Sequence, residues 1–228
     1  MRAREVPRTA KIGEARVLRI LRSLLPVVAI VVFTITVREC FRVARGAGHL
    51  EVYDQMGWHP VISYFGNDEP ERTIFRRGFT TLALVLATTL GTRALQLRGH
   101  RAIVRRGAAV LFGIVAVASL LVMTWIPDAV SPIHFFAALA TFFFLSGWEL
   151  VEASLIATAA RARGVRALDV AMLAWCFACP LLSVAAVVRW STQADVLAQY
   201  AAVALQFAWF LGAIPELARR DGSRAMLA

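Results

Sequence analysis

Two glutamates, Glu149 and Glu152, are the residues whose type and spacing most suggest chemistry. They stand three positions apart, so on a helix they share one face, and they directly follow an uncharged apolar stretch, residues 129–148. Ionisable side chains in or beside such a stretch are candidates for binding a lipid headgroup or a proton. Arginines expected at the same level could instead pair with them, namely Arg93, Arg98, Arg161 and Arg163. The sequence therefore leaves open both a ligand site and a structural charge pair.

The histidines and cysteines follow no pattern typical of a metal centre or an active site. His49, His59 and His134 have carboxylates nearby, but they lack His-x-x-x-His or His-Glu-x-x-His spacing. The Gly-x-Ser-x-Gly turn of the serine hydrolases is also absent. Cys176 and Cys179 form a Cys-x-x-Cys pair inside an apolar stretch, where helix packing is the expected role. We therefore predict no metal, no cofactor and no catalytic residue, which makes an enzyme the less favoured class.

The elements that must position these residues are apolar stretches long enough to cross a bilayer. Of the 228 residues, 59% are apolar, against about 45–50% in a soluble domain. Four uncharged stretches approach the roughly 20 residues of a span: residues 107–127, 129–148, 170–188 and 196–215. Two shorter ones, residues 23–37 and 78–92, reach that length if flanking arginines extend along the helix to the interface. The predicted fold is all-α, a bundle of six membrane-spanning helices.

The positive charges predict how these six spans are oriented. Eighteen of the 25 basic residues fall in the N-terminal arm, the second and fourth connections and the C-terminal tail. Because Lys and Arg favour the cytoplasmic side, both termini are expected there. The chain then divides into a cytoplasmic basic arm over residues 1–16, a membrane domain over residues 17–217 and a cytoplasmic tail over residues 218–228. The membrane would be the cytoplasmic membrane of a bacterium, or otherwise an endomembrane.

The basic residues allow two further interpretations. A net charge of +10 would suit nucleic acid, but the arginines flank apolar stretches instead of forming one basic face. Membrane lipid with anionic headgroups is the expected partner, and nucleic acid is not. Residues 23–37 could alternatively be a signal peptide, because a basic segment precedes them and residues 44–48 are rich in small side chains. The long basic lead and the lack of a clean Ala-x-Ala cleavage site favour a span.

One connection is long, residues 38–77, and it is predicted to be an outer loop between the first two spans. Loops of this length without secondary structure are usually functional or disordered, and aromatic residues here argue against disorder. Pro60 restricts the backbone, Gly66 permits a positive φ, and Pro70 with Glu71 suits the first turn of a helix. These features predict a fixed cap over the outer mouth of the bundle. Headgroup recognition by Ser63, Asn67 and backbone amides is the alternative.

A segment of this loop resembles the signature of a known family. Residues 60–75 read Pro-x-Ile-Ser-x-x-Gly-x-x-x-Pro-Glu-x-x-x-Phe, which is similar to the loop motif of the Frag/DRAM/Sfk membrane proteins. That family includes a GPI-anchor lipid-remodelling factor, the autophagy modulators and the N-terminal domain of a ceramide-remodelling cell-wall (CWH-type) protein. The matching residues are Pro60, Ile62, Ser63, Gly66, Pro70, Glu71 and Phe75.

A second match begins at the outer start of the predicted fourth span. Residues 134–142 look like the family's His-x-x-Gly-Ala-x-x-x-Phe, in which His134, Ala138 and Phe142 fit and Ala137 stands where glycine is usual. Tyr64 replaces an aspartate that is frequent in the family, so a role for that carboxylate does not carry over.

The resemblance implies a six-span, multi-pass protein that binds, senses or helps to organise membrane lipid without catalysing a reaction. One alternative is a membrane-embedded lipid-remodelling enzyme or its accessory factor, which the missing catalytic motifs count against. A second is a small-solute transporter, which the missing repeat between the two halves of the sequence counts against. In a bacterium, which has no GPI anchors, the best-known role of the family could not transfer as it stands.

Overall fold

The computed structural model describes residues 8–51, 62–96, 103–126, 132–163, 167–193 and 196–225, and all the regular structure in these ranges is helical. The elements are α1 (Arg8–Gly46), a 3-10 helix η1 (Ile62–Gly66), α3 (Glu71–Gln96), α4 (Ile103–Trp125), α5 (Pro132–Arg163), α6 (Ala167–Gln193) and α7 (Val196–Ala225). The predicted all-α class is therefore confirmed for the described part of the chain.

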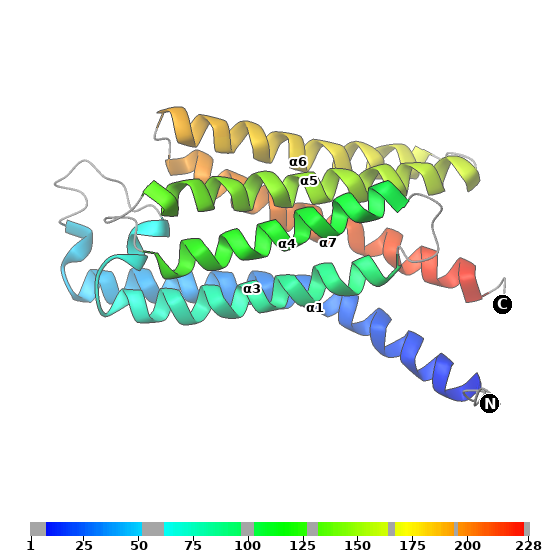
Figure 1. Ribbon diagram of the computed structural model, residues 1–228, viewed down its shortest axis with the longest axis horizontal. Coiled ribbons are helices and arrows are strands. Elements are labelled where there is room, and N and C mark those ends of the chain that lie inside the picture. The colour runs from blue at the N-terminus through cyan, green and yellow to red at the C-terminus, as the bar shows by residue number, and fades with distance from the viewer. Residues whose placement is uncertain are drawn as a thin grey trace.

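The six long helices form a bundle in which helices consecutive in the sequence lie side by side (Figure 1). The last helix, α7, also contacts α1 and α5, so the bundle closes on itself. The start of α1 and the end of α7 lie at the same end of the molecule, and η1 lies at the other end (Figure 1). The N-terminal part of α1 points away from its neighbours, and Pro26 within the helix supplies a reason for a bend, because proline lacks a backbone N–H.

In the part of the chain that the structure describes, four helices are long and apolar enough to cross a membrane: Ser23–Gly46 in α1, Ile103–Trp125 of α4, Pro132–Thr158 in α5 and Asp169–Gln193 in α6. The apolar part of α7 among the described residues, Val196–Gly212, is shorter. Large apolar side chains on these helices point outward, including Leu24, Val31, Ile114 and Leu181. Outward apolar surface on such helices indicates a multi-pass membrane protein.

The predicted second span, residues 78–92, lies in α3, which does not reach the same level of apolarity. Threonines dilute it, but their hydroxyl groups donate to backbone carbonyls of the same helix, as Thr81 does to Arg77, Thr88 to Leu84 and Thr89 to Val85. Hydroxyl groups that are satisfied in this way cost little in an apolar environment. Hydropathy alone therefore underestimates how well α3 would tolerate a membrane.

The connection between α1 and α3 is shorter than the predicted loop of residues 38–77. The first helix continues to Gly46 and α3 begins at Glu71, so both ends of that range are helical. The arginines in this range mark an interface, and charged residues do not by themselves end a helix. Similarly, α1 and α7 run through the boundaries proposed at residues 16 and 217.

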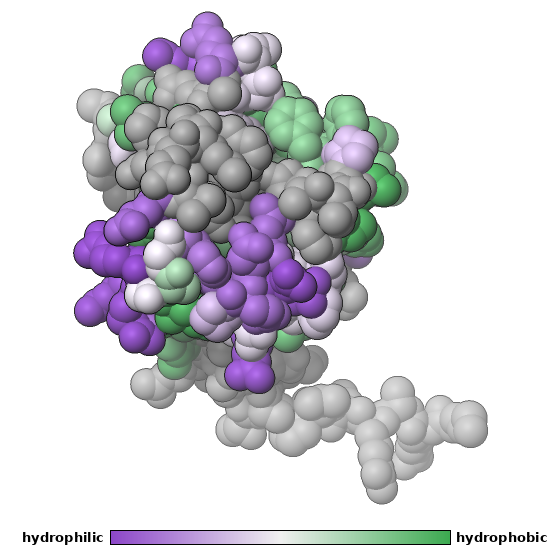
Figure 2. Space-filling view, turned by 90° about the vertical axis from the view of Figure 1, so that its left-hand side faces the viewer, coloured by the Kyte–Doolittle hydropathy of each residue, from purple (hydrophilic) through white to green (hydrophobic). Residues whose placement is uncertain are grey.

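The end of the bundle that carries η1 and the start of α3 is largely hydrophilic in its described part, with hydrophobic residues on the flanks (Figure 2). This distribution is the one expected where helices leave an apolar layer and meet water.

Candidate functional site

Glu152 forms an ion pair inside the bundle with Arg93 of α3. The Arg93 Nη1 and Glu152 Oε2 atoms are 3.0 Å apart, and the two side chains are 1% and 5% exposed. Arg93 was one of four arginines that the sequence offered as partners; Arg98 lies outside the described residues. Because both charges are removed from solvent, each depends on the other for stability.

Three aromatic rings surround the Arg93 guanidinium. Its central carbon lies 5.4 Å from the ring centre of Trp148 and 5.3 Å from those of Trp209 and Phe210. A cation held over aromatic faces gains electrostatic stabilisation, most of all when it is desolvated. The Trp209 indole N–H donates to the Cys176 carbonyl at 2.9 Å, which fixes one of these rings between α7 and α6.

Glu149 belongs to the same layer of the bundle and is fully buried. The Glu149 carboxylate accepts hydrogen bonds, so the Gln206 side chain is oriented with its amide nitrogen towards it. In this orientation the amide nitrogen lies 2.5 and 3.2 Å from the two carboxylate oxygens. The Gln206 carbonyl then accepts from Ser146 at 2.7 Å and from Ser183 at 3.0 Å. Gln206 thus links α7 to α5 and α6.

The two glutamates therefore have different partners. Glu152 is paired with a cation, whereas Glu149 is held by an amide, and together the contacts tie α3, α5, α6 and α7 at one level. Among the residues that the structure describes, no group of three or more His, Cys, Asp or Glu is placed to hold a metal ion. The arrangement can fix the helices relative to one another and can hold a buried charge.

The loop-motif residues gather at the opposite end. Ile62 and Phe65 of η1 are buried, and the Ile62 N–H donates to the Gln199 side chain of α7 at 3.2 Å. Phe75 is completely buried one turn into α3, and Pro70 directly precedes that helix. Pro60 lies outside the described residues, as does the side chain of Ser63.

Gly66 does not have the backbone conformation that the sequence suggested. The positive φ in this region is at Gly48, with a value of 77°, and Gly66 is required for a different reason. A Cβ at Gly66 would lie 3.3 Å from Cε1 of the Phe75 ring, which is closer than ordinary packing allows. The glycine lets η1 approach α3, so close packing and not backbone freedom explains it.

Glu71, in the first turn of α3, has a side chain that is 1% exposed and has a specific partner. The Glu71 Oε1 and His49 Nδ1 atoms are 2.6 Å apart. This contact joins the residues after α1 to the first residue of α3. The His49–Glu71 contact therefore links the loop motif to the end of α1, and the sequence did not indicate this link.

His134, at the start of α5, contacts the end of α4. Its Nδ1 lies 2.6 Å from the Ile126 carbonyl, which can only accept, so this nitrogen donates and in the neutral ring Nε2 is the acceptor. Nε2 is buried and has no hydrogen-bond partner among the residues described. The structure does not join His134 to Glu149 and Glu152, which lie further along the same helix.

Beneath η1 the bundle contains a narrow internal cavity of about 80 Å³. Ile62 lines one part of it and Gln206 another, with apolar side chains of five helices between them. η1 therefore lies over an internal space, as a cap would.

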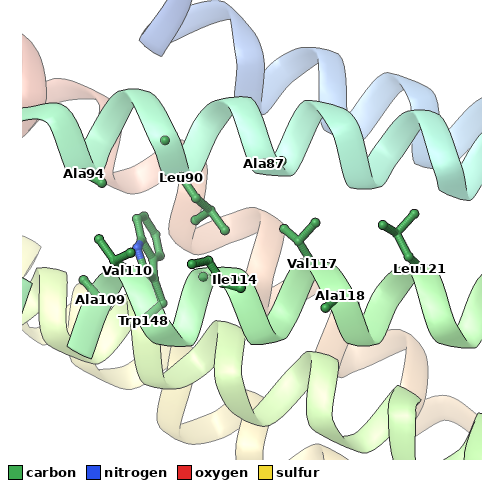
Figure 3. Close-up of a pocket in the computed structure, with 12 residues that line it drawn as sticks. Ala87, Leu90, Ala94, Ala109, Val110, Ile114, Val117, Ala118, Leu121 and Trp148 are labelled. Carbon is green, nitrogen blue, oxygen red and sulfur yellow. The ribbon is translucent and has the colours of Figure 1, made fainter. Parts of the chain in front are cut away.

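A larger hollow of about 350 Å³ lies between α3 and α4 (Figure 3). We call it the α3–α4 groove. Small residues of α3 and α4 create it, because Ala87, Gly91, Ala109 and Gly113 leave space between the helices, and Trp148 of α5 closes its inner side. The sequence contains a signal for it that was overlooked: Ala109 and Gly113 are four apart, a spacing of small residues typical of close helix approach.

Together, the outward apolar surfaces, the all-helical bundle and the buried ionic layer define a multi-pass helical membrane protein. The chain matches no protein-family model, no curated protein and no solved structure. The family resemblance seen in the sequence therefore remains a hypothesis.

Proposed function

We propose that the chain is a six-span membrane protein that binds membrane lipid and catalyses no reaction, with both termini in the cytoplasm. The α3–α4 groove is the observation that carries the lipid part of this proposal. The similarity of residues 60–75 to the Frag/DRAM/Sfk signature supports the same class of function.

Six spans are supported by the position and length of α3 and α7. α3 has 26 residues, about 39 Å of helix at 1.5 Å each, which exceeds the roughly 30 Å of a hydrocarbon core. It packs between α1 and α4, both of which are long and apolar enough to span. A helix of that length between two spans also crosses, and the same argument holds for α7 between α1 and α6.

The α3–α4 groove has the properties of a site for a lipid chain. Its volume of about 350 Å³ falls within the range of small-molecule sites, and its lining is almost entirely apolar. Val110 and Ile114 border it and are 40% and 62% exposed, so the groove opens on the surface that would face the bilayer. In a membrane, the molecules available to fill such a surface are lipids.

The buried polar groups support a role without catalysis. Arg93 pairs with Glu152 through Nη1, and Glu149 is held by Gln206, so both contacts stabilise the packing of the helices. The Arg93 guanidinium contacts the ring of Trp148, and Trp148 also lines the α3–α4 groove.

Native mass spectrometry with lipid identification, on protein extracted from membranes, tests the proposal. The double variant Ala87→Leu/Ala118→Leu places two larger side chains in the α3–α4 groove, and Ala185→Leu, at an exposed position of α6 outside it, is the control. We expect wild type and control to retain a lipid that the double variant loses. Equal retention by all three proteins would overturn the proposal.

A second candidate, a lipid-remodelling enzyme, is favoured by one observation. His134 has one ring nitrogen bonded to a carbonyl and the other basic and unpartnered among the described residues, an arrangement used by general bases. Comparing membrane lipids from cells that produce wild type and His134→Gln tests this alternative. A lipid species that changes with wild type but not with the variant would favour an enzyme.

A further inference from the structure

One arginine stands in register with the α3–α4 groove. Arg106, Val110, Gly113 and Val117 are spaced by four, three and four residues, so all four lie on the same face of α4. The last three line the groove, and Arg106 lies one helical turn, about 6 Å, beyond Val110. The groove therefore ends at a positive charge.

Arg106 is available to a ligand in a way that Arg93 and Arg105 are not. Arg93 is paired with Glu152, and Arg105 donates to the Thr158 hydroxyl at 3.2 Å. Arg106 is only partly exposed, and it has no ion-pair partner in the part of the chain that the structure describes. Its alkyl stem can extend the apolar lining while the guanidinium meets the headgroup region.

The opposite end of the groove does not offer the same chemistry. There Arg76 lies over the Trp125 ring, 5.2 Å from its centre, and donates to the Trp125 carbonyl at 3.3 Å. Its charge is therefore already engaged. The two ends differ, which gives a lipid in the α3–α4 groove a preferred direction.

We infer that the α3–α4 groove binds an anionic phospholipid, with one acyl chain between the helices over Trp148 and the phosphate at Arg106. This inference rests on the proposed function and adds the headgroup class and the direction of the lipid. The lipid comes from the leaflet next to the α3–α4 connection, the leaflet predicted to be cytoplasmic. Anionic lipids concentrate in that leaflet, and guanidinium groups bind phosphate oxygens well.

The test uses the full chain in detergent with an equimolar mixture of phosphatidylglycerol and phosphatidylcholine that carry the same acyl chains. Native mass spectrometry gives the ratio of the two lipids bound to wild type, Arg106→Gln and Arg161→Gln. Arg161 is exposed at the same end of the bundle, so its variant removes an equal charge away from the groove. We expect wild type and Arg161→Gln to prefer phosphatidylglycerol. In Arg106→Gln the ratio of bound phosphatidylglycerol to phosphatidylcholine should be about fivefold lower.

The groove variant Ala87→Leu/Ala118→Leu separates the two claims. If it loses bound lipid while wild type shows no headgroup preference, the α3–α4 groove binds lipid and the inference about the headgroup is wrong. If it retains as much lipid as wild type, both the inference and the proposed function are wrong. The inference would also be overturned if Arg106→Gln and Arg161→Gln reduced the phosphatidylglycerol preference equally. That result would mean that the preference depends on the total positive charge and not on a site at Arg106.

Discussion

The Arg93 guanidinium lies 5.4 Å from the centre of the Trp148 ring, and Trp148 also lines the α3–α4 groove. The buried ion pair and the groove therefore share one side chain. A change in the interior of the bundle can reach the apolar surface through this ring.

Removing one member of the ion pair should destabilise the bundle. Arg93→Gln leaves Glu152 buried without its cation, which costs about 3–5 kcal/mol for a buried pair. Thermal unfolding of the purified protein in detergent, with Arg93→Gln, Glu152→Gln and the double variant, measures this. The double variant should lose clearly less than the sum of the single ones, and simple additivity would show that the pair is not coupled.

The two glutamates should differ in their sensitivity to an amide. Glu149→Gln can still hydrogen bond with Gln206 and should stay within about 1 kcal/mol of wild type, whereas Glu152→Gln leaves the Arg93 charge unpaired. The thermal unfolding midpoints of the two variants, measured in the same detergent, show which variant is less stable. A lipid role for these residues predicts instead that replacing both changes the co-purifying lipid without loss of protein.

Gly78 should not tolerate a methyl group. A Cβ at this position would collide with the Thr36 side chain, so Gly78→Ala forces α1 and α3 apart at a cost of about 1–3 kcal/mol. Gly91→Ala is the control, because a Cβ there meets no atom within 4 Å in the same helix α3. If Gly78→Ala and Gly91→Ala unfold at the same temperature, α1 does not pack on α3 as described.

Gly66→Val should displace the Phe75 ring and loosen η1 over the internal cavity. We expect a lower yield and faster proteolysis between α1 and α3, since η1 loses its close contact with α3. Gly46→Ala, at the end of α1, adds a Cβ into open space and should behave like wild type. If Gly66→Val resists protease as well as that control does, the motif does not form a packed cap.

The helices were predictable where composition alone determines them. The described parts of the stretches at residues 107–127, 129–148 and 170–188 lie almost entirely in α4, α5 and α6, because an uncharged run of that length has few other stable forms. Residues 78–92 were harder, since the threonines of α3 lower its hydropathy although their hydroxyl groups are satisfied within the helix. The length of α1 was missed because Arg38 and Arg42 were taken to mark its end.

The candidate site was predictable only in part. Glu149 and Glu152 could be found from their charge in an apolar context, and Arg93 was among the partners considered. The aromatic rings around Arg93 and the division of the glutamates between an arginine and an amide depend on helix rotation, which spacing within one helix does not determine. The α3–α4 groove depends in the same way on how two helices meet around Gly113 and Leu90.

Photocrosslinking in lipid nanodiscs tests lipid binding in the α3–α4 groove most directly. A phospholipid with a diazirine in its acyl chain is irradiated with wild type and with Ala87→Leu/Ala118→Leu, and the labelled peptides are mapped by mass spectrometry. We predict that labelling concentrates on α3 and α4 around Leu90 and Ile114 and falls in the double variant. Labelling spread evenly over the exposed apolar surface, including Leu24 and Leu181, and unchanged in the double variant, would contradict the proposed function.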